Sequence, residues 1–359
     1  MDEPYAGPPP MLRPQQVQHQ APPFLSWQPA VPWTSPPWTP PPPALPPGTP
    51  PHDVPRPYLQ VMRTRDWAWW RPLLGLLLIT VIYLVAATLV VLLALVTDVA
   101  PNLDLLDLVD PAVLLVTNLS LIIAIPVVWL AWVVAHGLRP GWSASVLARL
   151  RWRLLPPFTL IALATLGLGI GLSVLLSFLV GGETVTGPVP AFGWLLVVVL
   201  LTTPLQSAAE EYLFRGYLSQ AIAGWIRVPA VGAIVAALVT ATLFSLAHAP
   251  GDLSTFLDRF AFGLTASAVV WLTGGLEAAI VLHAVNNVVV FVLAGALGEG
   301  VATEEVPDGS GLLFLGVSLL TMAAYVALVR RASGRLRPET HTAAQDFRRP
   351  PAVLPAPAP

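Results

Sequence analysis

Three short stretches place ionisable and amide side chains inside segments that are otherwise almost wholly apolar. They are "EEYLFR" at 210–215, "FSLAH" at 244–248 and "HAVNN" at 283–287. Ionisable residues within apolar spans are rare, and they usually face a cavity or a charged partner. A carboxylate, two histidines and an amide on three separate segments therefore indicate one shared polar site.

Helical spacing separates the roles of the neighbouring glutamates. Glu211 and Arg215 are four residues apart, so they can pair on one helix face. Glu210 then projects about 100° around the helix, where it is free to face another element. His283 and Asn287 are also four residues apart and share a face.

The second stretch has the same helical spacing, and its depth matches that of the first. Phe244 lies one turn before His248 on the same face. Glu210 lies 17 residues before Arg227, near the expected turn, and His248 lies 21 residues after it. At about 1.5 Å of rise per residue both reach similar heights, so we expect them to meet across a helical hairpin.

Such a set of side chains can hydrolyse an amide without a protein nucleophile. A carboxylate and a histidine can hold and deprotonate a water molecule. A histidine and an asparagine can donate to the oxygen that becomes negative when water attacks a carbonyl. Alternatively, a glutamate and two histidines can bind a divalent metal such as zinc. The sequence contains no H-E-x-x-H motif, so the spacing leaves both mechanisms open.

Other charged residues near these spans have simpler interpretations. Glu277 follows "GG" and is interpreted as a charge at a helix start. Asp258 and Arg259 lie near the start of their span and are interpreted as interfacial residues.

Composition indicates a membrane protein. The chain has 359 residues, of which 55% are hydrophobic and 11% are charged, whereas soluble domains are about a quarter charged. A net charge of −2 argues against a nucleic-acid partner. The absence of cysteine excludes disulfides, thiolate metal sites and a cysteine nucleophile. All 18 basic residues are arginine, which suggests GC-rich coding and a bacterial source.

Apolar runs of about 20 residues predict an all-α polytopic membrane protein with about eight transmembrane helices. The expected spans are 72–96, 112–134, 158–180, 192–223, 229–248, 255–273, 276–297 and 312–329. Gly167 and Gly171 have a spacing typical of close helix packing. The arginine-rich stretch 139–153 predicts an interfacial helix.

We expect five parts along the chain. The segment 1–60 holds 21 of the 40 prolines and is predicted to be a disordered, Pro-rich cytoplasmic tail. Two transmembrane helices plus an interfacial segment follow at 61–157, and the polar membrane core at 158–298. The last transmembrane helix lies within 299–330. A disordered, basic cytoplasmic tail covers 331–359.

Arginine placement predicts the orientation in the cell membrane. Arginines precede the first span, separate the second from the third, and follow the eighth, whereas the loop after the first span and the loop before the eighth are acidic. Both termini of this multi-pass protein are therefore predicted to be cytoplasmic.

In order, the three stretches match E-E-x-x-x-R, F-x-x-x-H and H-x-x-x-N, and the chain thereby resembles the CPBP family of intramembrane proteases. That family includes CAAX prenyl endopeptidases and bacteriocin-immunity proteins. The wording "AAEEYLFRGYL" and "SLAHAPGD" is also typical of bacterial members. The resemblance covers about 158–298.

The resemblance implies a role for each motif residue. Glu210 and His248 would activate water, and His283 and Asn287 would stabilise the oxyanion. The residues that would support the site are Glu211, Arg215 and Phe244. The family is often labelled metalloprotease, although a metal-free glutamate mechanism is also argued for it. If a metal is present, its ligands would be Glu210, His248 and His283.

The resulting hypothesis is an intramembrane endopeptidase that acts on membrane-associated proteins or peptides in the lipid bilayer. A non-catalytic immunity or scaffold protein, which uses the same polar cluster to bind a partner, is the alternative. A transporter with a proton relay is a third possibility. Internal repeats would favour it, and the sequence shows no convincing repeat.

Overall fold

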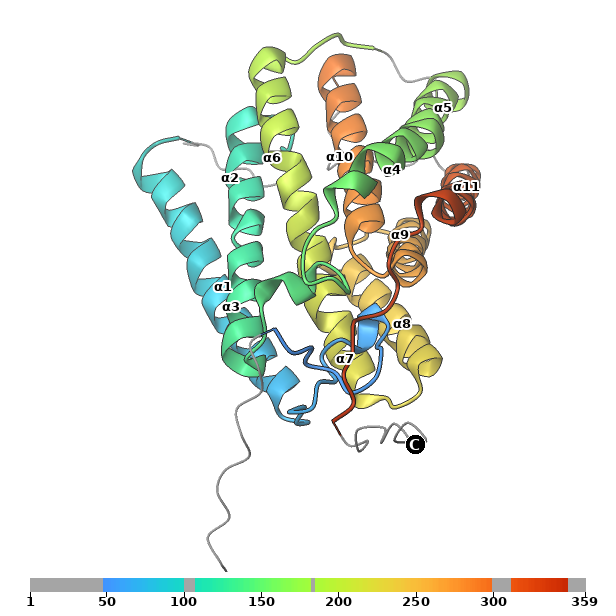
Figure 1. The fold of residues 1–359 in the computed structure, drawn as a ribbon. Coiled ribbons are helices and arrows are strands. Elements are labelled where there is room, and N and C mark those ends of the chain that lie inside the picture. The colour runs from blue at the N-terminus through green and yellow to red at the C-terminus, as the bar shows by residue number, and fades with distance from the viewer. Residues whose placement is uncertain (1–47, 100–106, 182–184, 299–310, 348–359) are drawn as a thin grey trace, which may run out of the picture. The chain divides into compact units, whose positions relative to one another are not determined.

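The computed structural model describes residues 48–99, 107–181, 185–298 and 311–347 (Figure 1). Eight of the helical segments in these residues are long and apolar enough to cross a membrane, and the protein is an all-α polytopic membrane protein. The spans are Arg71–Val96, Pro111–His136, Trp152–Leu179, Phe192–Trp225, Pro229–Ala247, Leu253–Thr273, Glu277–Leu297 and Gly311–Leu336. At most of their ends, the predicted spans agree with the observed spans to within a few residues.

Several spans consist of more than one helical element. The second comprises α2 (Pro111–Ile122) and α3 (Ala124–His136), and the third contains η3 (Trp152–Leu154), α4 (Leu155–Ala162), η4 (Leu163–Gly167), α5 (Leu168–Leu176) and part of η5 (Ser177–Gly181). The fourth comprises α6 (Phe192–Leu213), η6 (Phe214–Leu218) and α7 (Ser219–Trp225). The remaining spans are α1 (Arg71–Val96), α8 (Pro229–Ala247), α9 (Leu253–Thr273), α10 (Glu277–Leu297) and α11 (Gly311–Leu336).

Local sequence explains where the helices begin, break and end. Asp252 caps α9 by accepting from the backbone N–H of Thr255 at 2.8 Å. Pro126 has no N–H to donate to Ile122, which accounts for the break between α2 and α3. Gly274, at φ +70°, ends α9 in the left-handed conformation that glycine tolerates best.

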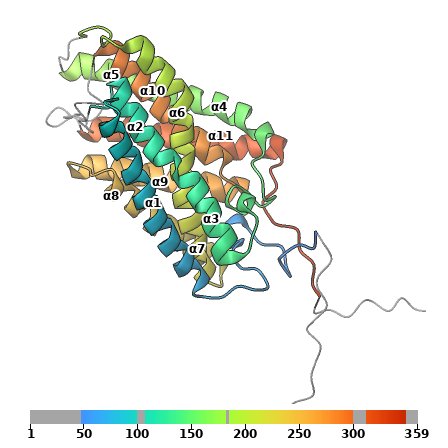
Figure 2. The ribbon, with the colours of Figure 1, turned by 90° about the vertical axis from the view of Figure 1, so that its left-hand side faces the viewer.

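The long helix α6 is central to the arrangement. It packs against α10 on one side and α2 on the other, while α8 pairs with α9 and α9 with α11 (Figures 1 and 2). The three predicted motifs lie on α6–η6, α8 and α10. The packing of these helices therefore brings together residues that are far apart in sequence.

The close approach predicted for Gly167 and Gly171 is wrong. A Cβ at Gly171 would meet nothing within 4 Å, and one at Gly167 would meet only the Leu163 side chain, at 3.9 Å. A Cβ at Gly169, in contrast, would lie 2.3 Å from Thr321 Cγ2 of α11. The wide π-helical turn η4 ends at Gly167 and rotates the helix face that follows it relative to regular α-helical spacing.

The interfacial helix predicted for 139–153 is also wrong. The segment contains the 3₁₀ turns η2 (Pro140–Ser143) and η3 (Trp152–Leu154), and between them lies a loop. That loop hydrogen-bonds to the α9–α10 connection, where the Leu276 N–H donates to the Ala144 carbonyl at 2.8 Å. Loop backbone groups find partners there, so a continuous helix is not needed to satisfy them.

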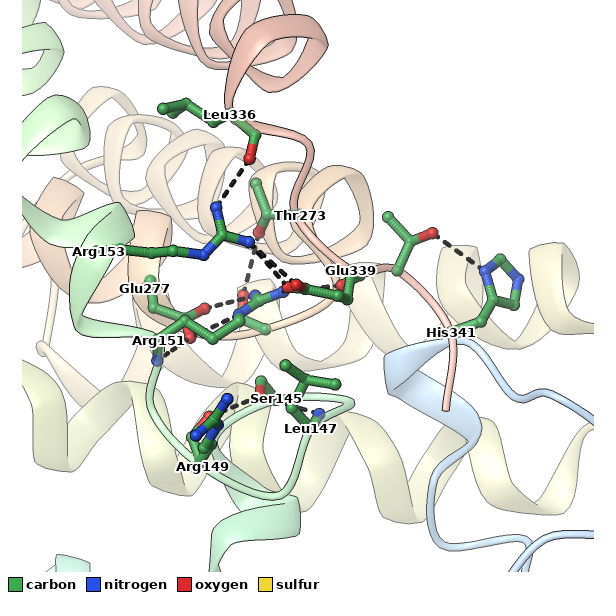
Figure 3. Close-up of polar contacts among 12 residues, drawn as sticks. Ser145, Leu147, Arg149, Arg151, Arg153, Thr273, Glu277, Leu336, Glu339 and His341 are labelled. Atoms are coloured by element: carbon green, nitrogen blue, oxygen red, sulfur yellow. Dashed lines mark hydrogen bonds and ion pairs between the residues drawn. The ribbon is translucent and has the colours of Figure 1, made fainter. Parts of the chain in front are cut away.

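Two arginines and two glutamates tie this loop to α10 and to the C-terminal segment (Figure 3). Arg151 binds Glu277 through two side-chain hydrogen bonds of 2.9 and 2.7 Å. Arg153 binds Glu339, with the shorter contact at 3.0 Å. We call these four residues the arginine–glutamate cluster.

The membrane-proximal ends of both predicted disordered tails are folded in the structure. The Thr342 N–H donates to the Arg56 carbonyl and the Gln345 N–H to that of His52, each at 2.9 Å. Residues 48–60 and 331–347 therefore do not fit the predicted disorder, because backbone pairing and helix α11 order them. Residues 1–47 and 348–359 lie outside the described residues.

This pairing places the two segments on one side of the helical unit. An even number of crossings requires that placement. The assignment of that side to the cytoplasm stays a prediction.

Candidate active site

Glu210, His248 and His283 converge from three different helical segments. Glu210 lies in α6, His248 caps the C-terminal end of α8, and His283 lies in α10. Glu210 Oε2 is 3.8 Å from His248 Nε2 and 3.9 Å from His283 Nε2. These separations exceed a direct hydrogen bond and suit a small molecule or ion held among the three groups.

The meeting of Glu210 and His248 was predicted from their matching depths in the α6–α8 hairpin, and the geometry confirms it. His283 joins them from α10. We call Glu210, Glu211, Arg215, His248 and His283 the acid–histidine cluster.

Glu211 holds the side chain of His283. Its Oε1 accepts from Arg215 Nη1 at 2.9 Å and from His283 Nδ1 at 3.0 Å. The expected pair between Glu211 and Arg215 is therefore present, and both side chains are fully buried. Arg215 also donates from Nη2 to the carbonyl of Gly263 at 3.0 Å.

Glycine at position 263 allows α8 and α9 to approach this closely. A Cβ there would lie 2.8 Å from the backbone of Ala241 and 3.3 Å from Arg215 Nη2. The hydrogen bond from Arg215 to the Gly263 carbonyl fixes Arg215, and through it Glu211, against α9.

Phe244 is the apolar centre of the site. Its ring centroid lies 4.5 Å from that of His248 and 5.7 Å from that of His283. The ring also stacks on Phe262 of α9 at 5.8 Å, and the Arg215 guanidinium carbon is 5.0 Å from its centroid. Phe244 therefore packs against both imidazoles.

Asn287 joins the site through a residue that the sequence analysis missed. Its Nδ2 donates to Gln206 Oε1 at 3.2 Å, and Gln206 Nε2 donates to Glu210 Oε1. Gln206 thus bridges α10 to Glu210. Its position one turn before Glu210, on the same helix face, was the signal that pointed to it.

Hydrogen bonding assigns one proton position on each histidine. His248 Nδ1 is 2.7 Å from the Phe244 carbonyl, and His283 Nδ1 is 3.0 Å from the Glu211 carboxylate. Both partners are acceptors, so each Nδ1 must carry a hydrogen. In the neutral form each Nε2 is then an acceptor, and His283 donates from Nε2 only as an imidazolium.

Exposure differs across the site. The side chain of His248 is 30% exposed, that of Glu210 is 11% and that of His283 is 2%. A reactant therefore approaches from the side of His248 and Glu210, and His283 forms the closed side.

The donor types fit a divalent metal such as zinc. Glu210 Oε2 is buried without a hydrogen-bond partner, and the Nε2 atoms of His248 and His283 both face it. Each imidazole is oriented by an acceptor on its other nitrogen, as is usual for metal ligands. Ligands that lie about 2.0–2.2 Å from a tetrahedral zinc ion are about 3.3–3.6 Å from one another, so the separations of 3.8 and 3.9 Å here are a few tenths of an ångström wider than in a closed zinc site. Within the described residues, no group of three or more acidic or histidine side chains has metal-site spacing already.

Fold and site together define a class: a polytopic membrane protein with an acid–histidine cluster buried between its helices. Residues 192–289 match the family model described as "Type II CAAX prenyl endopeptidase Rce1-like". The matched segment contains Glu210, His248, His283 and Asn287, and the resemblance noted in the sequence is confirmed.

A curated relative is similar to a longer part of the chain than the family model is. The uncharacterized protein YyaK of Bacillus subtilis strain 168 is 27% identical over an alignment of 198 residues, which covers 52% of this chain. The chain covers 63% of the length of that relative. No solved structure matches the chain.

Proposed function

We propose that this protein is an intramembrane endopeptidase that cleaves membrane-associated proteins or peptides with an activated water. The observation that carries the proposal is the unpartnered carboxylate oxygen Glu210 Oε2, which lies 3.8–3.9 Å from two imidazole nitrogens. An unpartnered buried charge is costly, and a reacting group bound there repays that cost.

Glu210 and His248 would activate the water. Water held between Glu210 Oε2 and His248 Nε2 gives a proton to one of these acceptors as its oxygen bonds to the scissile carbonyl carbon. The same proton then passes to the leaving amine as the carbon–nitrogen bond breaks. Gln206 keeps Glu210 in place by donating to its other oxygen.

His283 and Asn287 would stabilise the negative oxygen of the tetrahedral intermediate. An imidazolium at His283 donates from Nε2 while Glu211 accepts from Nδ1. In that form Glu210 and Glu211 balance Arg215 and His283, so the cluster has no net charge. Buried charges are tolerated best when they balance in this way.

In a metal-dependent form, Glu210, His248 and His283 would hold the ion. A bound zinc ion supplies Lewis acidity at the scissile carbonyl. Exhaustive chelation separates the two forms. Activity that survives it supports the metal-free form, and activity that is lost and then restored by zinc supports the metal-dependent form.

The proposal is tested by comparing membrane and secreted peptides from cells that carry wild-type protein or Glu210→Gln at equal levels. We expect peptides that depend on Glu210 to disappear in the variant. Glu339→Gln is the matched control, since its side chain is 41% exposed in the arginine–glutamate cluster, and it should keep them.

An immunity or scaffold protein predicts a different outcome. If Glu210→Gln and His248→Ala both insert and both keep the biological phenotype, the cluster binds a partner without catalysis. Identical peptide profiles in all strains would contradict the endopeptidase.

A further inference from the structure

The C-terminal end of α11 carries arginines that the proposed mechanism does not use. They are exposed, and the stretch 330–337 that contains them has no acidic residue. They are Arg330, Arg331, Arg335 and Arg337, and we call them the arginine patch. Among the residues that the structure describes, none of the four takes part in an ion pair. Cations this close together repel one another, so an anion bound among them lowers the free energy of the patch.

The length of α11 places the arginine patch at the depth of the lipid headgroups. The helix has 26 residues, whereas about 20 helical residues cross the hydrocarbon core of a bilayer. Counted from Gly311, about 20 residues end at Arg330. The patch therefore lies at and beyond the edge of the core, where the charged groups of the lipids are within its reach.

The patch continues the side of α11 that faces lipid. One side of the helix is buried against the protein, at Met322, Tyr325 and Val329. Another side is exposed and apolar, at Leu313, Leu320 and Leu328. Arg331 follows Leu328 by three residues and Arg335 follows Arg331 by four, spacings that keep neighbours on one helix surface. The surface that contacts acyl chains thus becomes cationic at its end, which favours a lipid over a soluble anion as the ligand.

A second segment of the chain adds an aromatic residue beside the patch. Arg153 Nη1 donates to the Leu336 carbonyl at 2.8 Å, which places it between Arg335 and Arg337 in the chain (Figure 3). The residue before it, Trp152, is 73% exposed, and exposed tryptophans gather at the membrane–water interface. Arg153 is already bound by Glu339, so the unpaired charge stays on the four arginines of α11.

The chemistry of these side chains selects a phosphate group with net negative charge. A guanidinium donates two parallel hydrogen bonds to phosphate oxygens. Clusters of about four to eight basic residues beside a transmembrane helix attract anionic lipids, and each residue adds a roughly fivefold preference, or about 1 kcal/mol. Phosphatidylcholine carries a phosphate as well, but its choline cation cancels that charge. The patch therefore suits a lipid without such a cation.

We propose that the arginine patch binds the headgroup of an anionic phospholipid such as phosphatidylglycerol. The site is separate from the acid–histidine cluster, and the proposal does not depend on the proposed endopeptidase function. A lipid held there also fixes the end of α11. Through Leu336, Arg153 and Glu339, it is linked to the arginine–glutamate cluster at the start of α10.

A comparison of two lipids with identical acyl chains tests the proposal. The full-length protein in dodecyl maltoside is titrated with 1-palmitoyl-2-oleoyl phosphatidylglycerol or phosphatidylcholine, and native mass spectrometry counts the bound lipids. We expect the wild type to bind phosphatidylglycerol roughly 25-fold more tightly, the product of two arginines at one headgroup. Equal affinity for the two lipids overturns the proposal.

The double variant Arg331→Gln/Arg335→Gln should bring the preference below about threefold by weakening phosphatidylglycerol alone. Arg331→Lys/Arg335→Lys should keep most of it, because the charge is retained. The matched control is Arg139→Gln/Arg227→Gln, which removes two exposed arginines from other loops and should keep the full preference. An equal loss in this control would assign the attraction to the total charge of the protein and overturns a site at α11.

Two further outcomes separate a lipid site from its alternatives. Inorganic phosphate in large excess should not displace phosphatidylglycerol, because it lacks the acyl chains that contact the apolar side of α11. Complete displacement by inorganic phosphate would mean a site for free phosphate and contradict the lipid. Equal weakening of both lipids in Arg331→Gln/Arg335→Gln would mean that these arginines support the fold, and it also overturns the proposal.

Discussion

Two groups of charged side chains in this protein both pair glutamate with arginine, but with different results. In the arginine–glutamate cluster, both carboxylate oxygens of Glu277 are hydrogen-bonded to Arg151. In the acid–histidine cluster, Glu210 and Glu211 each keep one buried oxygen without a hydrogen-bond partner.

The difference separates a structural ion pair from a candidate reactive one. Complete pairing satisfies Glu277 and holds a loop, a helix start and the C-terminal segment together (Figure 3). Incomplete pairing leaves Glu210 able to interact with a water, an ion or a substrate. Burial and charge alone do not identify a catalytic carboxylate, whereas an unsatisfied oxygen beside two oriented histidines does point to one.

The largest expected effect outside the carboxylates themselves is on His248. His248→Ala removes the exposed acceptor beside Glu210 Oε2, and we expect peptide cleavage to fall by roughly 10²- to 10⁴-fold, the contribution of a general acid–base group. Initial rates with reconstituted protein measure this. His341→Ala, which changes an exposed histidine of the C-terminal segment, is the control and should keep wild-type rates.

The next effect concerns the oxyanion. Asn287→Ala should lower kcat by about 10²- to 10³-fold with little change in KM, because the donor acts on charge that develops only in the transition state. Asn286→Ala is the neighbouring control and should lose less than about 10-fold. Equal losses for both asparagines would contradict a specific role for Asn287.

A smaller loss is expected at Gln206, a positioning residue that links Glu210 to Asn287. Gln206→Leu keeps the volume but removes the hydrogen bonds to Glu210 and Asn287, and kcat should fall roughly 10-fold at unchanged KM. The melting temperature should change little. A large drop in melting temperature with kcat unchanged would instead make Gln206 a structural residue.

The smallest effect is confined to the start of α9. Hydrogen bonds from Ser254 and Thr255 lower the pKa of Asp252 to about 2. The ionised Asp252 carboxylate therefore stabilises the start of α9 fully above the pKa of the unfolded state, about 3.9. This stabilisation is lost as the pH falls toward 2. Amide hydrogen exchange in residues 253–257, corrected for intrinsic pH dependence, should accelerate in that window. Asp252→Asn should remove the dependence, and a pH-independent wild-type rate would contradict this cap.

The sequence was sufficient to predict the spans and the meeting of Glu210 with His248, because hydropathy and helical rise are local properties. The Glu211–Arg215 pair followed from spacing within one helix for the same reason. The pair of Arg151 with Glu277 joins residues 126 positions apart, and no local periodicity signals such a contact. The position of Gly169 was missed because the π-helical turn η4 rotates the helix face.

Gln206 shows another reason why the sequence alone did not predict every residue of the site. It had a usable signal, a polar side chain one turn from Glu210, but amides in spans also serve as ordinary interhelical hydrogen-bond donors. Only the packing of α10 against α6 shows that Gln206 contacts Asn287 as well as Glu210.

The most direct test of the account is a matched comparison of Glu210→Gln and Glu277→Gln for both cleavage rate and stability to unfolding. Glu210→Gln should lose at least about 10³-fold in kcat at wild-type stability or slightly above it, because a buried carboxylate oxygen without a hydrogen-bond partner is replaced. Glu277→Gln should lose about 3–5 kcal/mol of stability, as expected for a broken buried pair, and keep its kcat per folded molecule. Full activity in Glu210→Gln, or a stability loss there equal to that of Glu277→Gln, would contradict the assignment of Glu210 as the reactive carboxylate.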